Sequence, residues 1–320
     1  MAPISLGSYR NMNAMSRLFR TLISVCLCLV GLSPIVVWGE ETPQQVVATV
    51  NGKPIRAEQI QLQFFLDSLP ADSAPEVREK LVHELIDREL IRQFLASRQI
   101  TADAERLEQQ LAVIQQVIAK QGEELEDVLT RLHLTSATLR EVLALPLAWD
   151  AYVRSVVTDR QLQELWKAHR VELDGTRVQA AQIVRILPAG ATEAEWQQAE
   201  SFLAGLRQEI QSGTISFAEA AQRHSQSPSG KHGGDMGEFE YRGRVDDAIS
   251  QVAFTSPPGK ISPPFRTRSG VHLVQTQKII PGQLSQEDAR KELIARLSRQ
   301  LWDQKVEELR RRAKVQFSQP

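Results

Sequence analysis

Residues 217–239 read FAEAAQRHSQSPSGKHGGDMGEF, the densest pattern in the chain. The segment opens with helix-favouring residues and then places glycine at positions 230, 233, 234 and 237. Glycine adopts positive φ angles and allows close backbone approach, as a tight functional loop requires. A phosphate-binding loop is the competing interpretation, but no strand leads directly into the segment and no Lys-Ser/Thr pair follows it. The pattern therefore predicts a short helix followed by a glycine-rich functional loop.

The sequence on both sides of this loop predicts one compact unit. Residues 178–187 form an apolar run typical of a buried strand. Thr192 and Glu195 form a capping box. The helix after them carries an apolar stripe made up of Trp196, Ala199, Phe202, Leu203, Leu206 and Ile210. Beyond the loop we expect a short helix near 246–254, a turn at 257–259 and a closing strand at 271–277. The order of elements is therefore β-α-α-loop-α-β.

Most of the remaining chain has a helical pattern. Between residues 57 and 170 apolar side chains recur at helical spacing, and the run 284–314 continues this pattern. Short strands are expected near both ends, at 46–50 before the turn Asn51-Gly52 and at 315–317. The economical inference is that these end strands pair, so that the middle unit is an insertion. The predicted fold class is α+β.

The first 39 residues have the features of a secretion signal. Arg17 and Arg20 precede an apolar run at 22–32, and Gly39 offers a small residue at a cleavage point. A retained membrane anchor is the alternative, although polar residues and a proline interrupt the apolar run. We therefore expect an exported protein, periplasmic or extracytoplasmic, that contacts the membrane only if the leader is retained.

Composition argues against several classes of site. Both cysteines, Cys26 and Cys28, lie in the leader, so the mature chain would hold no disulfide, no thiolate zinc site and no cysteine nucleophile. The six histidines show no metal-ligand spacing, and we expect neither metal nor cofactor. A formal net charge of -1 gives no electrostatic footprint for nucleic acid.

Several motifs resemble those of a known family. After the glycine-rich segment come Ala253-Phe254, the run PGKISPP at 258–264 and the run SGVHL at 269–273. In order and spacing, the span 178–278 resembles the parvulin peptidyl-prolyl isomerases. The runs VNGKPI at 50–55 and LIDREL at 85–90 resemble the chaperone part of extracytoplasmic foldases of the SurA and PrsA type.

The expected domain limits follow from the patterns and from this resemblance. We expect a signal peptide at 1–39 and a helical chaperone-like domain at 40–175. A parvulin-like β-α-α-α-β domain would occupy 176–281. The C-terminal helix and strand at 282–320 would then pack on the N-terminal domain.

The resemblance also implies a polar site. His272 matches the histidine of the family's closing strand, and Ser269 matches the hydroxyl residue just before it. Gln182 stands where the family's opening strand has its other histidine. This glutamine could hydrogen-bond and orient His272, or it could be a polar residue merely tolerated in the strand. Ser227 stands where parvulins have cysteine or aspartate near the substrate carbonyl, and it brings no charge. The implied catalytic residues are His272, Ser227, Gln182 and Ser269.

The implied proline pocket is apolar and consists of Met236, Phe239, Val245 and Ile249. Methionine and phenylalanine offer adaptable apolar surfaces that suit a pyrrolidine ring. The plain alternative is that all four residues are ordinary core, and for Val245 and Ile249 both interpretations stay open. Ile249 is smaller than the aromatic residue usual in the family, so the pocket is expected to be shallow.

The function implied by the resemblance is that of an exported peptidyl-prolyl isomerase and chaperone. It would act on X-Pro bonds of unfolded or nascent exported polypeptides. The alternative is a non-catalytic holdase that uses a degenerate parvulin domain to bind peptides, and the departures at Gln182 and Ser227 favour it. Residues 186–193 lack the basic cluster of the family's phosphate-directed members, so no phosphopeptide specificity is expected.

Overall fold

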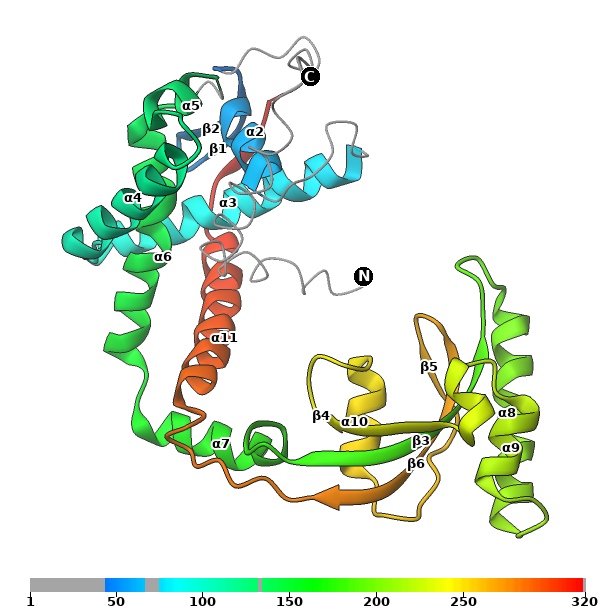
Figure 1. Ribbon diagram of the computed structural model, residues 1–320. Helices are drawn as coiled ribbons and strands as arrows, with labels where there is room; N and C mark the ends of the chain where they lie inside the picture. Colours follow the sequence, from blue (N-terminus) through cyan, green and yellow to red (C-terminus); the bar gives the residue numbers. More distant parts are fainter. Residues whose placement is uncertain (1–43, 67–74, 132–133, 319–320) are drawn as a thin grey trace. The chain divides into compact units, whose positions relative to one another are not determined.

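The structure is a computed structural model that describes residues 44–66, 75–131 and 134–318 (Figure 1). The chain forms two units, one made of Met1–Thr158 with Ile294–Pro320 and the other of Asp159–Leu293. Each unit combines helices with a small antiparallel sheet, which confirms the expected α+β class. The expected leader at 1–39, with Cys26 and Cys28, lies outside the described residues.

The sheet of the first unit has three strands. Strand β1 (Val46–Val50) lies between β2 (Lys53–Arg56) and β7 (Val315–Phe317), and both pairings are antiparallel. The turn from β1 to β2 is Asn51-Gly52, where φ is 52° and 83°. Positive φ at both central residues is typical of the type I′ hairpin that Asn-Gly favours. The predicted turn is therefore confirmed.

Helices supply the rest of the first unit. They are α2 (Ala57–Leu66), α3 (Pro75–Ser97), α4 (Ala104–Ala119), α5 (Leu125–Arg131), α6 (Ser136–Val156) and most of α11 (Arg290–Arg310). Helices α6 and α11 meet at Trp149 and Trp302, whose rings pack edge to face with centroids 5.0 Å apart. The indole N–H of the fully buried Trp149 donates to Ser298 Oγ at 3.0 Å. This bond satisfies the one polar group of the Trp149 side chain.

The second unit begins with α7 (Asp159–Leu173) and contains a four-stranded antiparallel sheet in the order β4-β3-β6-β5. Its elements after α7 are β3 (Arg177–Ile186), α8 (Glu193–Gln211), α9 (Phe217–His224), the 3-10 helix η1 (Pro228–His232), β4 (Asp235–Glu240), α10 (Asp247–Thr255), β5 (Phe265–Thr267) and β6 (Gly270–Ile280). Strands β4 and β5 are absent from the order of elements that the sequence predicts. Glycine interrupts β4, and β5 has three residues after two prolines, so neither strand shows the alternation that predicts strands.

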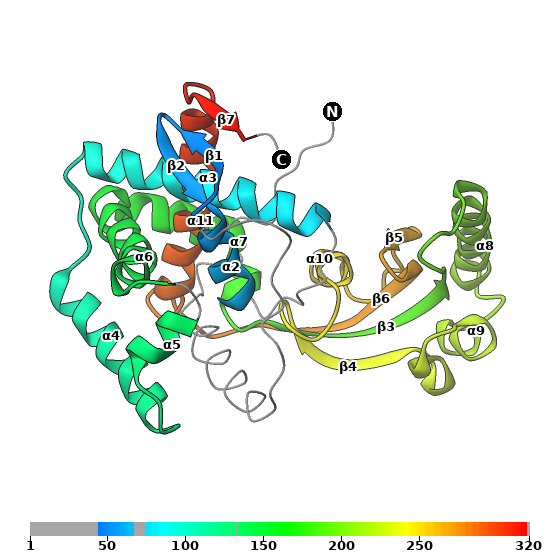
Figure 2. The same cartoon turned by 90° about the horizontal axis from the view of Figure 1, so that it is seen from above.

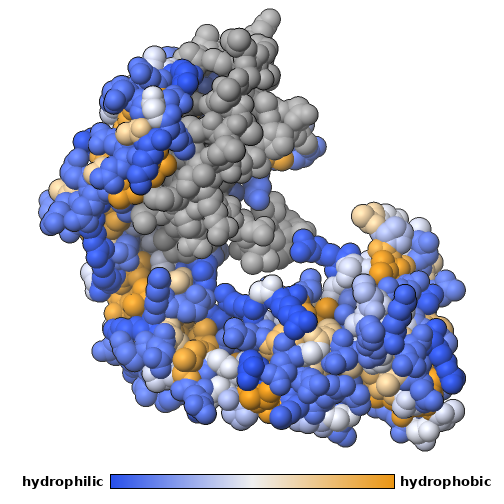
Figure 3. Space-filling model, in the orientation of Figure 1, coloured by the Kyte–Doolittle hydropathy of each residue, from blue (hydrophilic) through white to orange (hydrophobic). Residues whose placement is uncertain are grey.

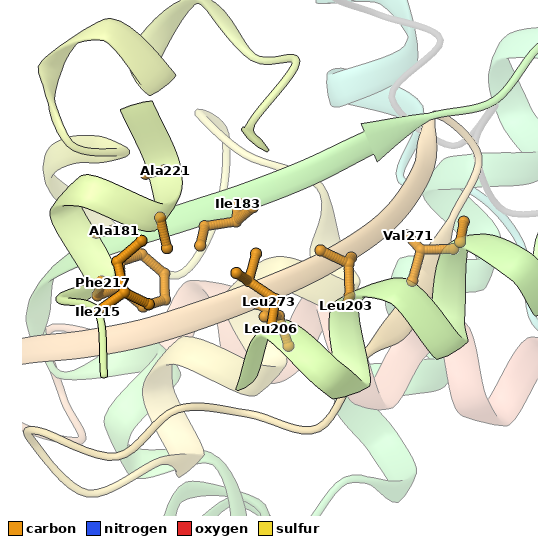
Figure 4. Close-up of a cluster of buried hydrophobic side chains, with 11 residues drawn as sticks. Ala181, Ile183, Leu203, Leu206, Ile215, Phe217, Ala221, Val271 and Leu273 are labelled. Carbon is orange, nitrogen blue, oxygen red and sulfur yellow. The ribbon is translucent and has the colours of Figure 1, made fainter. Parts of the chain in front are cut away.

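Helices cover both faces of this sheet. Alternate residues of a strand point to opposite sides. Ala181 and Ile183 of β3 therefore pack with α8 and α9, while Val178 and Ala180 pack with α10. Figures 1 and 2 show the strands running between α10 and the pair α8 and α9. Figure 4 shows Leu203 of α8 in the first of these apolar layers, facing the strands.

One edge of β3 is completed by the glycine-rich loop. Strand β6 pairs along the whole of β3, but β4 pairs only with its first half. Beyond that point, Gly234 O accepts from the N–H of Gln182 at 2.9 Å. Ser225 Oγ accepts from the N–H of Val184 at 3.2 Å, and the N–H of Gln226 donates to Val184 O at 2.9 Å. The loop thus satisfies backbone groups that would be costly to bury without partners.

Replacement of Gly234 tests this close approach. Gly234 has a φ of 82°, and a Cβ there would lie 2.4 Å from Gln182 O. We expect Gly234→Ala to lower the free energy of unfolding by about 2 kcal/mol or more, because backbone strain and a steric clash add. Chemical unfolding measures this change. Gly213→Ala is the matched control, since Gly213 has a φ of 79° in open space. Gly213→Ala should lower the free energy of unfolding by only about 1 kcal/mol. Equal losses in the two variants would contradict the proposed clash at Gly234.

The surface visible in Figure 3 is mostly hydrophilic, and its hydrophobic residues form separate patches. Among the large apolar side chains, Phe202 and Ile186 are 40% and 53% exposed. Within the described ranges, no helix combines the length and the apolar character needed to span a membrane.

Candidate functional site

The candidate site is centred on His272 of β6, on the face of the sheet that α10 covers. His272 lies opposite Val184 of β3 on one side and opposite Phe265 of β5 on the other. Its ring stacks on Phe265 with 5.7 Å between centroids and 26° between planes. Gln182 is two residues from Val184 along β3, so it points to the same face. His272 is only 3% exposed. The sheet register therefore places a buried imidazole between an aromatic ring and Gln182.

Both ring nitrogens of His272 have hydrogen-bond partners. Nδ1 is 3.2 Å from Gln182 Oε1. Nε2 is 2.8 Å from Thr267 Oγ1 and 3.4 Å from Ser269 Oγ. An amide oxygen only accepts, so Nδ1 carries the proton and Nε2 accepts from a hydroxyl. The hydrogen bond between Gln182 and His272 that the sequence left open is present, and it orients the ring.

Burial keeps this imidazole neutral. Removal from water penalises the charged form of the ring and lowers the pKa of His272 to about 4, although the carboxylate of Asp246 acts in the opposite direction. At neutral pH His272 is therefore an uncharged ring with one donor and one acceptor, both already engaged by neighbouring side chains.

An NMR titration of the His272 ring tests this charge state. The folded-state pKa of about 4 lies below the ordinary value of 6.5. The neutral ring therefore contributes its full stability above about pH 6.5, and that contribution is lost as the pH falls toward 4. We expect the His272 ring signals to stay constant from pH 8 to about pH 5.5 and to titrate with a midpoint near 4. A midpoint near 6.5 would contradict the burial argument.

The four predicted pocket residues lie in one apolar cluster on the same face of the sheet. Met236 and Phe239 come from β4, Ile249 comes from α10, and Val245 comes from the loop between them. The first three are less than a tenth exposed, while Val245 is half-buried. Phe265, which stacks on the imidazole, also packs against this cluster. The apolar and polar parts of the candidate site are therefore contiguous.

Ser227 belongs to a neighbouring group of hydroxyls. Its Oγ is 3.2 Å from Ser225 Oγ and 2.8 Å from Ser229 Oγ. Ser225 in turn accepts from the N–H of Val184, the residue opposite the site histidine. Of the four predicted polar residues, Gln182 and Ser269 therefore contact His272 directly. The fourth, Ser227, is held beside β3 through Ser225.

Three further residues of the site are not predicted by the sequence patterns. Phe265 and Thr267 lie on β5, and the short length of this strand hides its pairing with β6. Thr267 stands two residues before Ser269, and this alternation of hydroxyl residues is the signal that could have identified it. Asp246 caps α10 by accepting from the N–H of Ala248 at 2.9 Å, and its carboxylate acts on the imidazole.

Comparison with protein families identifies this part of the chain. Residues 183–278 match the rotamase family of PPIC-type PPIase domains. The chain carries a parvulin domain. The matched residues of this parvulin domain run from the middle of β3 to near the end of β6, and they include His272, Ser227 and Ser269. Gln182 stands directly before the first matched residue.

Similarity to known proteins extends beyond the parvulin domain. Chaperone SurA of Chromohalobacter salexigens is 24% identical over 263 residues, which are 78% of this chain and 60% of that protein. Foldase protein PrsA of Caldanaerobacter subterraneus subsp. tengcongensis is 26% identical over 282 residues, which are 82% of each chain. The solved structure of peptidylprolyl isomerase PrsA from Bacillus anthracis aligns with a TM-score of 0.48 and 16% identity, covering 71% of this chain and 96% of that one. The chain thus spans less than two thirds of the SurA relative.

Proposed function

We propose that the chain is a folding factor that catalyses cis-trans isomerisation of peptide bonds before proline. The observation that carries the proposal is the neutral His272 ring, held by Gln182 and Thr267 beside an apolar cluster in a parvulin domain. The relatives named Chaperone SurA and Foldase protein PrsA support a role in folding. The substrates we propose are therefore unfolded or nascent polypeptides.

Rotation about an X-Pro bond needs neither a covalent intermediate nor proton transfer. The barrier of about 18 to 20 kcal/mol comes from the partial double bond of the amide. The uncatalysed reaction takes tens to hundreds of seconds and can limit folding. In the twisted amide this resonance is lost, and the charges on the carbonyl oxygen and the nitrogen change. A site accelerates the rotation if its shape and its oriented dipoles bind the twisted amide better than the planar one.

The candidate site has an apolar part, which would bind the proline ring, and a polar part, which would interact with the amide. Met236, Phe239, Val245 and Ile249 form the apolar cluster against which we propose that the proline ring packs. His272 is the fixed neutral dipole beside that surface, and Gln182 holds the orientation of its ring. Ser269 and Ser227 supply hydroxyl groups for the amide. None of these groups carries a formal charge at neutral pH, so catalysis rests on geometry and dipoles.

Isomerase activity of the full chain tests the proposal. We expect it to accelerate a refolding reaction that is limited by proline isomerisation, and to turn over an X-Pro tetrapeptide. His272→Ala should lower kcat/KM by about tenfold, because an oriented hydrogen-bonding group is lost and its partners are left unpaired.

The control for this experiment is His232→Ala. His232 is exposed in η1, so its loss should leave kcat/KM unchanged. If the intact chain were no faster than an inert carrier protein, the isomerase proposal would fail. Suppression of client aggregation without any turnover would instead support the holdase.

Replacement of Gln182 by histidine probes the departure from the family pattern. In the native chain kcat/KM should be flat between about pH 5.5 and 8, because His272 stays neutral there. Gln182→His places a second titratable ring against His272, so we expect the pH profile to gain a transition in this range. Gln179→His on the same strand is the matched control, because side chains three residues apart on a strand point to opposite faces. An unchanged profile in Gln182→His would argue against direct coupling of the two side chains.

We also propose that the protein is exported and that its clients are exported polypeptides without phosphate specificity. The secretion-signal pattern at 1–39 supports export, and the lack of basic residues at 186–193 supports clients without phosphate. For the mature chain, we propose domain limits at 40–175, 176–281 and 282–320.

Mass spectrometry of the mature protein tests removal of the leader, and a chain that begins at Glu40 is the expected result. Retention of residues 1–39 would overturn the proposed cleavage.

A further inference from the structure

Three serine hydroxyls form a continuous hydrogen-bonded chain beside β3. Ser225 Oγ is 3.2 Å from Ser227 Oγ, which is 2.8 Å from Ser229 Oγ. All three residues are half-buried. Their backbone is held in place as well, because the N–H of Gly230 donates to Ser227 O at 3.0 Å and the N–H of Gly234 donates to Ser229 O at 2.9 Å. The hydroxyl positions are therefore set by the fold of the loop.

Counting donors and acceptors sets the direction of the first hydrogen bond in this chain, from Ser225 to Ser227. A serine hydroxyl has one hydrogen to donate and two lone pairs that accept. Ser225 Oγ accepts from the backbone N–H of Val184 at 3.2 Å and from that of Ser227 at 3.4 Å. Both lone pairs are thus used, and the hydrogen of Ser225 points to Ser227 Oγ. Whichever way the next bond runs, one hydroxyl hydrogen of Ser227 or Ser229 is left to donate outward.

Packing around Ser225 leaves this arrangement little freedom. Gly230 is buried, and a Cβ at that position would lie 3.1 Å from Ser225 Cβ and 3.2 Å from Ala221 O. The loop therefore turns back tightly over the end of α9. Ser225 Oγ also accepts a hydrogen bond from the N–H of Val184, which is paired with His272 on the neighbouring strand β6. The first hydroxyl of the chain is anchored on the strand that carries the site.

We propose that Ser225 and Ser229 are positioning residues whose hydroxyls both donate to Ser227 Oγ, so that the hydrogen of Ser227 is left to donate a hydrogen bond to the carbonyl group of a bound peptide. This inference rests on the proposed function and refines it. Where the parvulin pattern has cysteine or aspartate, this chain supplies a neutral donor whose direction is set by two backbone N–H groups on its neighbour Ser225.

A double-mutant cycle on the full chain tests the proposal. The variants are Ser225→Ala, Ser227→Ala and the pair together, with kcat/KM for an X-Pro tetrapeptide as the first readout. Each single variant should lower kcat/KM by about threefold to tenfold, the range expected for one hydrogen bond. Because Ser225 acts through Ser227, the double variant should be no worse than Ser227→Ala alone. Additive losses would mean that Ser225 only supports β3, and they would overturn the proposal.

Two further measurements separate this result from a loss of folding and from failure of the proposed function. Ser216→Ala removes a capping hydroxyl at the start of α9, and it should lower the unfolding midpoint while leaving kcat/KM unchanged. The dissociation constant of the same tetrapeptide gives a second cycle that needs no turnover. Binding without turnover would refute the isomerase, while non-additive losses of affinity would still uphold the hydroxyl chain. Additive losses of affinity would overturn the chain, and neither binding nor turnover would overturn both proposals.

Discussion

The antiparallel pairing of β3 with β6 is the constraint on which the candidate site depends. This register sets His272 opposite Val184 and beside Gln182, so the imidazole and its amide partner share one face. A slip of one residue would turn His272 toward α8 and α9 instead. Close approaches of glycine to β3 help to exclude such a slip. A Cβ on Gly270 would lie 2.0 Å from Arg185 O, and one on Gly234 would meet Gln182 O. Because these glycines have no side chain, the loop and β6 can approach β3 closely in this register.

Burial and neutrality of the site have the same origin. The sheet, α10 and the stacked ring of Phe265 shield His272 from water, and this shielding lowers its pKa to about 4. A neutral ring needs no charged partner, which explains why an uncharged glutamine can occupy the position facing it. The hydroxyls of Thr267 and Ser269 complete a network without formal charge. Such a network suits a reaction that moves no proton and that responds to fixed dipoles and shape.

The sequence predicts those parts of the fold whose causes are local. The turn Asn51-Gly52 follows from backbone preference, and the capping box of Thr192 and Glu195 is present at the start of α8. The short edge strands β4 and β5 could not be predicted, because their stability comes from pairing with β3 and β6 rather than from their own residues. Thr267 was missed for this reason. The serine chain also depends on the path of the loop across β3, which no local pattern encodes.

The central claim is that the full chain interconverts the two isomers of an X-Pro bond. NMR exchange spectroscopy on an X-Pro peptide measures this directly, because the cis and trans forms give separate signals and uncatalysed exchange takes tens to hundreds of seconds. With a catalytic amount of the protein, cross-peaks between the two forms are expected within sub-second mixing times, and they should weaken strongly in His272→Ala. Peptide signals that shift on binding while the exchange cross-peaks stay absent would contradict the claim.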